Sequence, residues 1–209
     1  MFNPAAILTA KRAMRSIEKA IYDPAIWPYY GWHNDHAGTD RTANYLPAIQ
    51  QDKNEFWALL CAIMEAGLYG GRALQLGIGQ SGLSHKMWRY VFEDVVSVDM
   101  DAGAIANAHK WCHEEDENLI CKNTSAAVFR LLGEFDFLFI DAGHLEANVR
   151  EDYITYAPLV RKGGIIAFHD ALERKGYEDE ITVHKFLANF DQPLKTVGDV
   201  IGTAWMVKG

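Results

Sequence analysis

Short apolar runs alternate with longer amphipathic segments along most of the chain. Such runs predict buried strands, and apolar residues at helical spacing predict helices. Strands are expected at 73–76, 95–98, 119–121, 135–140 and 165–168, and helices at 5–21, 54–67, 83–92, 102–112, 124–132, 145–156 and 181–190. This alternation favours an α/β domain with a mostly parallel sheet and helices on both faces.

Two further apolar segments, 194–200 and 203–207, follow the last expected helix. The short connection between them cannot hold a parallel crossover, so we expect an antiparallel hairpin. Residues 158–164 contain Pro158 and the pair Gly163-Gly164, which predict a turn before the strand at 165–168.

Residues 22–47 show little periodicity and many aromatic side chains, among them Trp27 and Trp32. We interpret this stretch as a lid or a wall of a substrate pocket, with a packed arm or a subunit contact in a homo-oligomer as the alternative. The basic face of helix 5–21 suits a membrane surface or a partner, but a helix packed on the domain edge is the simpler interpretation. The expected division is an N-terminal helix and lid, 1–50, and a main domain, 51–209.

Composition narrows the class of protein. The formal net charge of -8 at pH 7 disfavours a nucleic-acid-binding surface. Three scattered cysteines, Cys61, Cys112 and Cys121, predict neither a metal site nor a disulfide framework. No apolar run is long enough to cross a membrane, and no signal peptide is apparent. We therefore expect a cytoplasmic protein without nucleic-acid or membrane partners.

A glycine-rich turn, Gly77-Ile-Gly-Gln-Ser-Gly82, lies between the strand at 73–76 and the helix at 83–92. A strand, a glycine turn and a helix in this order are typical of nucleotide-binding α/β units. Asp99 ends the next strand, 22 residues after Gly77. A carboxylate at this place can accept hydrogen bonds from both hydroxyls of a ribose.

Titratable residues follow two later strands. Asp141 and His144 come after the strand at 135–140, and His169 and Asp170 after the strand at 165–168. Ligands bind at the carboxyl ends of parallel strands, so these side chains predict a site there.

These side chains suit two kinds of chemistry. Asp141, His169 and Asp170 could hold a divalent metal, and His144 could act as a general base. The alternatives are that Asp141 caps a helix, His144 lies on an exposed helix face, and His169 is a core histidine.

Several segments resemble the class I S-adenosylmethionine-dependent methyltransferases, most closely the metal-dependent macrolide-sugar O-methyltransferases and the cephalosporin-hydroxylase-like group. The resemblance extends from about residue 52 to 209. The matching segments are 76–84, 87–89, 98–101, Phe139-Ile-Asp-Ala-Gly-His144 and Pro158-Leu-Val-Arg-Lys-Gly-Gly-Ile-Ile-Ala-Phe-His-Asp170.

The resemblance implies a Rossmann-like sheet of seven strands whose last strand is antiparallel, and it implies roles for individual residues. Asp99 would hold the cofactor ribose, and His144 would act as base. Asp141 and Asp170 would bind a metal, Mg²⁺ or Mn²⁺, and Asp141 would also border the cofactor. The remaining cofactor contacts would come from Gly77, Gly79 and Ser81 at the methionine part and from Ser125, with Thr124 or Ala126, at the adenine.

Two positions depart from the pattern of these families. Gln75 stands where the first strand usually carries an acid, which removes a contact near the cofactor. His169 stands where an acid usually precedes Asp170, which changes the ligands offered to a metal.

Taken together, these features predict metal-assisted O-methylation of a small hydroxylated molecule by S-adenosylmethionine. Methyl transfer without a metal, and a catalytically weak cofactor-binding relic that serves as a partner module, are the alternatives. A nicotinamide-dependent oxidoreductase shares the glycine turn and Asp99, but it does not explain Asp141-Ala-Gly-His144 or the final hairpin. An amino-methyltransferase of nucleic acids should carry an Asn/Asp-Pro-Pro-aromatic turn in place of 141–144.

Overall fold

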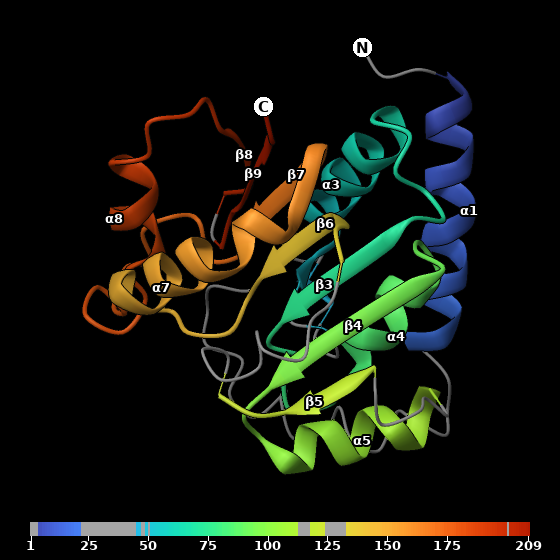
Figure 1. The fold of residues 1–209 in the computed structure, drawn as a ribbon, viewed down its shortest axis with the longest axis horizontal. Helices are drawn as coiled ribbons and strands as arrows, with labels where there is room; N and C mark the ends of the chain where they lie inside the picture. Colours follow the sequence, from blue (N-terminus) through green and yellow to red (C-terminus); the bar gives the residue numbers. More distant parts are fainter. Residues whose placement is uncertain are drawn as a thin grey trace.

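The computed structural model describes residues 4–21, 45–46, 49, 51–112, 118–123, 133–199 and 201–209. Its main feature is a seven-stranded sheet with the strand order β5-β4-β3-β6-β7-β9-β8 (Figure 1). The strands are β3 (Arg72–Leu76), β4 (Asp94–Asp99), β5 (Leu119–Cys121), β6 (Phe135–Ile140), β7 (Val160–Phe168), β8 (Lys195–Val197) and β9 (Thr203–Val207). Two short strands, β1 (Tyr45–Leu46) and β2 (Gln51–Asp52), pair separately and antiparallel.

Strand directions confirm the predicted Rossmann-like sheet. The five strands β3 to β7 pair in parallel, with Leu76 of β3 opposite Val98 of β4 and Ile140 of β6. β9 runs antiparallel to both β7 and β8, so the chain ends in the expected hairpin. The strand order reverses at β3, because β4 and β6 lie on its two sides. In such sheets the crevice at this reversal binds ligands.

Helices cover both faces of the sheet (Figure 1). One hydrophobic cluster joins α1, α3 and α4 to one face of the sheet, and a second cluster joins α7 and α8 to the other face. Neighbouring residues of a strand enter different clusters: Phe137 and Phe139 face the first, while Leu138 and Ile140 face the second. The helices are α1 (Pro4–Ile21), α3 (Lys53–Glu65), α4 (Leu83–Arg89), α5 (Ala102–Cys112), α7 (Glu146–Tyr156), the 3-10 turn η3 (Ala157–Leu159) and α8 (Val183–Ala188).

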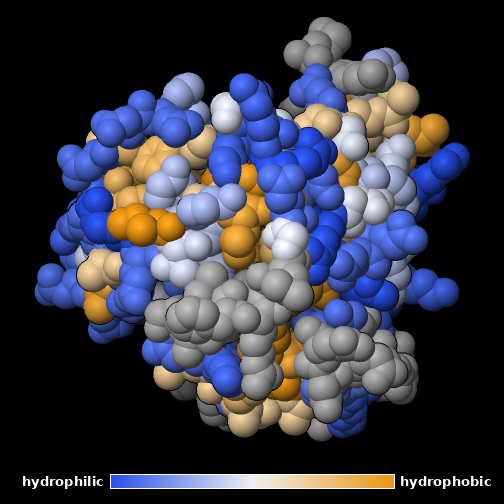
Figure 2. Space-filling view, viewed as in Figure 1, coloured by the Kyte–Doolittle hydropathy of each residue, from blue (hydrophilic) through white to orange (hydrophobic). Residues whose placement is uncertain are grey.

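Helix α1 packs against α3 and α4 of the main domain. Ala10 and Ile17 are fully buried, and they share the hydrophobic cluster with α3 and α4. This packing agrees with the simpler interpretation of its amphipathic pattern. None of the described helices is long and apolar enough to cross a membrane. On the face shown in Figure 2, hydrophilic residues predominate and hydrophobic ones form separate small areas.

The start of β7 differs from the prediction. The glycine pair was expected in a turn, but the strand already begins at Val160, which pairs with Phe135. The next pair is Phe137 with Ile165, so β7 contains a bulge. Gly163 has φ +80, and a Cβ on Gly164 would collide with Val160 and with the Asp136 carbonyl. The two glycines therefore permit an irregular backbone inside the strand rather than a turn before it.

Candidate active site

A cavity of about 310 Å³ lies at the carboxyl ends of β3, β4 and β6. The glycine turn and Asp99 border it on one side, and the loop 141–144 with the first half of α7 on another. This is the end of the sheet where parallel strands present ligand-binding loops. The described residues of its lining are Ile49, Gly77, Ile78, Gly79, Ser81, Ser84, Asp99, Met100, Asn123, Asp141, Ala142, Gly143, His144, Asn148, Glu151 and Asp152.

The glycine turn needs its glycines for two different reasons. Gly77 has φ +83, and a Cβ there would also collide with the carbonyl oxygen of Asp141. Gly82 has φ +66 and packs against the backbone of Ala104 and Ala108 in α5. Gly79 has φ +65 but no atom within 4 Å of the place of its Cβ. Gly77 and Gly82 therefore permit close packing, whereas Gly79 serves only the left-handed backbone of the turn.

Asp99 is held by the backbone on both sides of its carboxylate. Its Oδ2 accepts a hydrogen bond from the Ile78 N–H at 2.8 Å, and its Oδ1 accepts one from the Asp101 N–H at 2.8 Å. Each carboxylate oxygen can accept a second hydrogen bond. The side chain lines the cavity, so it is fixed in place and still able to accept donors from a ligand.

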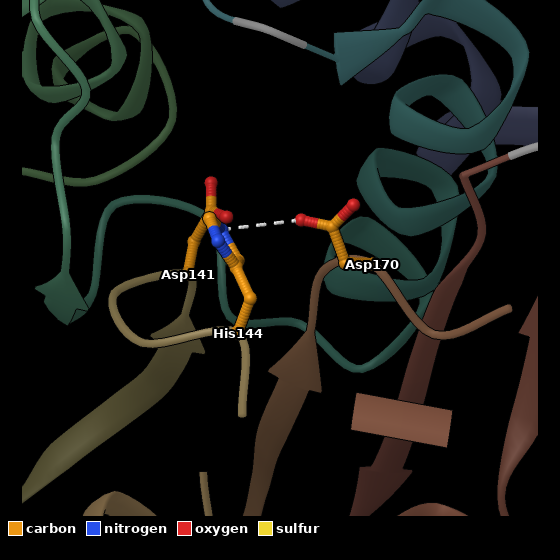
Figure 3. A group of neighbouring side chains, drawn as sticks. All are labelled: Asp141, His144 and Asp170. Atoms are coloured by element: carbon orange, nitrogen blue, oxygen red, sulfur yellow. Dashed lines mark ion pairs between the residues drawn. The ribbon is translucent and has the colours of Figure 1, made fainter. Parts of the chain in front are cut away.

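Asp141, His144 and Asp170 form a cluster beside this cavity (Figure 3). The loop after β6 supplies the first two residues, and the end of β7 supplies the third. His144 Nε2 lies 3.3 Å from Asp170 Oδ2, and one potential ligand atom from each side chain lies within 4.8 Å of the others. Asp170 has φ +52, a strained conformation for a residue other than glycine. Such strain is common at functional sites and agrees with a role for this residue.

His169 lies behind the cluster and joins its two carboxylates. Its Nδ1 is 3.0 Å from Asp141 Oδ1 and 3.1 Å from Asp170 Oδ2. Burial by itself would lower the pKa of His169, but the charges of Asp141 and Asp170 outweigh burial and raise the pKa well above its usual value. The two neighbouring carboxylates therefore favour the charged form of the ring.

Asp170 shows the reciprocal effect. Burial would raise the pKa of its carboxyl group, but the charges of His169, His144 and Arg174 together lower the pKa far below its usual value. Arg174 contributes through its guanidinium, 3.2 Å from Asp170 Oδ1. Asp141 receives a further contact from Gln51 Nε2, 3.3 Å from its Oδ2. Both carboxylates are thus held in place by neighbouring side chains.

The cluster fits a divalent cation by the chemistry of its donors. Two carboxylates and one imidazole are a ligand set suited to Mn²⁺, Fe²⁺ or Zn²⁺, and the carboxylates alone suit Mg²⁺. The sequence proposed His169 as the nitrogen ligand, which stays a prediction; in the structure its Nδ1 lies against Asp141 and Asp170. His144, expected as a base, is the imidazole that the structure groups with the two carboxylates.

The structure gathers most of the predicted cofactor residues at one cavity. Gly77, Gly79, Ser81, Asp99 and Asp141 all line it. Their contacts with a cofactor remain predictions. Ser125, Thr124 and Ala126 lie outside the described residues, as does most of the aromatic segment 22–47.

Sequence reasoning missed four residues that contribute to the site. Gln51 reaches Asp141 from β2, and only the fold brings residues this distant in sequence together. Arg174 follows Asp170 by four residues in a segment without periodicity, so no pattern indicated its contact. Asn148 and Glu151 line the cavity from α7. Helical spacing from the start of that helix would have indicated them.

Comparison with known proteins places these features in a wider group. Residues 64–171 match a protein family described as Methyltransferase domain. A Dictyostelium discoideum protein named Probable caffeoyl-CoA O-methyltransferase 3 is 27% identical over an alignment of 157 residues, and the match covers 66% of this chain. The match spans 57% of the length of that relative.

Two solved structures share the fold over nearly the whole chain. A methyltransferase from Podospora anserina bound to S-adenosylhomocysteine is 18% identical, with a TM-score of 0.60 over 100% of this chain and 97% of its own. The O-methyltransferase TomG from Streptomyces achromogenes, in complex with S-adenosylmethionine, is 17% identical, with a TM-score of 0.55 over 90% of this chain and 91% of its own.

Proposed function

The chain belongs to the methyltransferase-domain family, and from that premise we propose that it transfers a methyl group from S-adenosylmethionine to an oxygen of a small hydroxylated molecule. The observation that carries this proposal is one shared cavity, which has a glycine turn and Asp99 on one side and Asp141 with His144 on another. The curated relative supports oxygen as the acceptor atom, because it is named as an O-methyltransferase.

The residues on the cofactor side suit a nucleoside with an amino-acid tail. Asp99 would accept hydrogen bonds from the ribose hydroxyls with the lone pairs that Ile78 and Asp101 leave open. Gly77, Gly79 and Ser81 would contact the methionine part, because they border the same cavity. When bound, S-adenosylmethionine supplies an electrophilic methyl group on a positively charged sulfur.

His144 is the residue we assign as general base. Its Nε2 faces Asp170, so a neutral ring that donates from Nε2 carries its free lone pair on Nδ1. The acceptor oxygen would form a bond to the methyl carbon as the bond from carbon to sulfur breaks, and the sulfur keeps that electron pair. The acceptor proton would pass to His144. Holding both reactants in one cavity supplies the alignment on which this displacement depends.

A divalent cation would extend this scheme. Asp141 and Asp170 would hold it, and His169 would orient the two carboxylates from behind. Such a cation would supply a Lewis acid that lowers the pKa of the acceptor hydroxyl.

Methyl transfer without a metal is the second candidate function. It is favoured by the contacts that His169 and Arg174 already make with the two carboxylates, because these cations balance charge that a metal would otherwise balance. The two candidates differ in one measurable property, the response of turnover to chelation.

Calorimetric titration with S-adenosylhomocysteine tests the proposal. The titration is done first in EDTA and then with Mg²⁺ or Mn²⁺. Binding in EDTA supports the cofactor assignment, and separate heat from the metal supports the cation. Binding of NADH in place of S-adenosylhomocysteine would contradict the proposal and favour an oxidoreductase. Folded protein that binds neither would favour the relic.

A further inference from the structure

A buried polar network lies directly beneath the glycine turn. Gln75 of β3 is 1% exposed, and Ser84, His85 and Ser97 are equally buried. Gln75 is not among the described residues that line the cavity. Polar groups this deep in a parallel sheet are retained only where their hydrogen bonds are made. The partners of Gln75 therefore indicate what the network does.

The backbone of the turn is fixed at four points. The Gly77 N–H donates to the Val98 carbonyl at 2.8 Å, and the Gly77 carbonyl accepts from Gln75 Nε2 at 2.7 Å. The Ile78 N–H donates to Asp99 at 2.8 Å, and the Ile78 carbonyl accepts from Ser84 Oγ at 2.9 Å. All polar backbone groups of these two residues thus have partners within the protein. The turn is formed before any ligand arrives.

Gln75 supplies two of these restraints, one directly and one through Ser84. Its Nε2 lies 2.7 Å from the Gly77 carbonyl oxygen and 2.7 Å from Ser84 Oγ. Its Oε1 accepts from Ser97 Oγ at 3.2 Å, and Ser97 Oγ lies 2.8 Å from His85 Nδ1. Both ends of the amide are used.

A carboxylate could not replace this amide. An ionised glutamate only accepts hydrogen bonds, and the Gly77 carbonyl oxygen also only accepts. The two would face each other in a buried place without a donor, which is unfavourable for both. The acid that the resembled methyltransferases usually carry at the position of Gln75 would therefore disturb the glycine turn in this chain.

We propose that Gln75 is a positioning residue for methyl transfer: it holds the glycine turn in the conformation that receives the cofactor, without touching the cofactor. This inference rests on the proposed function, since the ligand of the turn is S-adenosylmethionine.

Titration of three variants with S-adenosylhomocysteine tests the role of Gln75. Gln75→Glu keeps the size and removes the donor, and Gln75→Met removes every hydrogen bond. Ser97→Ala is the matched control, because it removes the partner of Oε1 and leaves the donor of Nε2 on Gly77. Loss of a buried hydrogen bond predicts about a tenfold rise in Kd for both Gln75 variants. Ser97→Ala is expected to bind within about twofold of the wild type.

Kinetics separate positioning from a general loss of stability. We expect KM for S-adenosylmethionine to rise in the Gln75 variants, while KM for the acceptor stays unchanged. Wild-type Kd in a folded Gln75→Glu protein, or a loss of thermal stability without a change of Kd, would overturn the inference.

A fourth variant tests the inference if neither Gln75 variant folds. Ser84→Ala removes the hydrogen bond to the Ile78 carbonyl, and unchanged affinity there would overturn the inference as well. Absence of binding by the wild type would instead refute the proposed function itself, so the two failures are distinguishable.

Discussion

Asp99 serves the fold and a ligand with the same carboxylate. It fixes the Ile78 N–H in the glycine turn, and it faces the cavity. Asp99→Ala should weaken binding of S-adenosylhomocysteine by about ten- to a hundredfold, because hydrogen bonds to a charged group contribute about 1.5–3 kcal/mol each. Calorimetric titration measures the change. Asp101→Ala is the control, since the exposed Asp101 carboxylate accepts from the nearby Gly103 N–H, and alanine keeps the backbone N–H that donates to Asp99. Unchanged affinity in Asp99→Ala would remove Asp99 from the ribose.

His144 is the half-exposed member of the cluster, which suits a group that exchanges protons with a substrate. His144→Ala should lower kcat by about 10²–10⁴-fold, the usual contribution of a general base, and leave affinity for S-adenosylhomocysteine unchanged. Steady-state kinetics and calorimetry on the same protein give both values. His109→Ala in α5 is a control outside the cavity lining. Normal turnover would make His144 a surface histidine. If His144→Ala loses both turnover and the binding of a divalent metal, His144 is a metal ligand.

Asp170 can be neutralised without changing its unusual backbone. Asn accepts a positive φ nearly as well as any residue except glycine, so Asp170→Asn removes the charge and keeps the conformation. If Asp170 holds a cation, the variant should lose at least about tenfold in affinity for Mn²⁺, because a neutral amide oxygen attracts the cation less than a carboxylate does. Calorimetry measures this affinity. Glu173→Gln is the control, an exposed acid three residues away. A metal response equal to that of the wild type would exclude Asp170 as a ligand.

At the scale of elements, Glu55 connects α3 to the final hairpin. Its buried carboxylate accepts hydrogen bonds from the Gly202 N–H at 3.0 Å and the Thr203 hydroxyl at 3.2 Å. Glu55→Ala should lower the free energy of unfolding by about 2–4 kcal/mol, because two buried donors lose their acceptor. Urea denaturation measures this. Glu55→Gln retains one carbonyl oxygen, so it should cost clearly less than Glu55→Ala.

The same residue predicts a dependence of stability on pH. Burial raises the pKa of the Glu55 carboxyl, and the hydrogen bond from Gly202 offsets this only in part. The folded protein then binds the Glu55 proton more readily than the unfolded chain, so Glu55 stabilises less as pH rises from its unfolded pKa through its folded pKa. Glu55→Gln cannot titrate, and it should gain stability relative to the wild type over this interval. Parallel pH profiles of the two proteins would contradict a raised pKa.

At the scale of the whole molecule, the regular strands and helices could be predicted from the sequence, whereas the irregular contacts could not. The run Phe135–Ile140 predicted β6 because strands buried on both faces are continuously apolar. The bulge of β7 was missed because Gly163 and Gly164 are equally typical of a turn and of a bulge. The strand ends indicated where Asp99, Asp141 and Asp170 would lie, since topology alone brings them to the same edge of the sheet; their roles remain predictions. The partners of His169 and Gln75 depend on side-chain directions and on contacts between strands, which no periodicity encodes.

The cavity also connects segments that are distant in sequence, and this predicts a gain of stability on binding. Its lining extends from Ile49 beside β2 to Asp152 in α7, so a ligand would contact both sides of the β3 reversal. A ligand that binds only the folded state stabilises it by about 2.7 kcal/mol at a hundredfold excess over its Kd. For a domain of this size that corresponds to a rise of about 5–10 °C in Tm. Calorimetric unfolding with S-adenosylhomocysteine measures the rise, and Asp99→Ala at the same ligand concentration should show a smaller one. Binding seen by titration without any rise in Tm would mean that the ligand does not select the folded state.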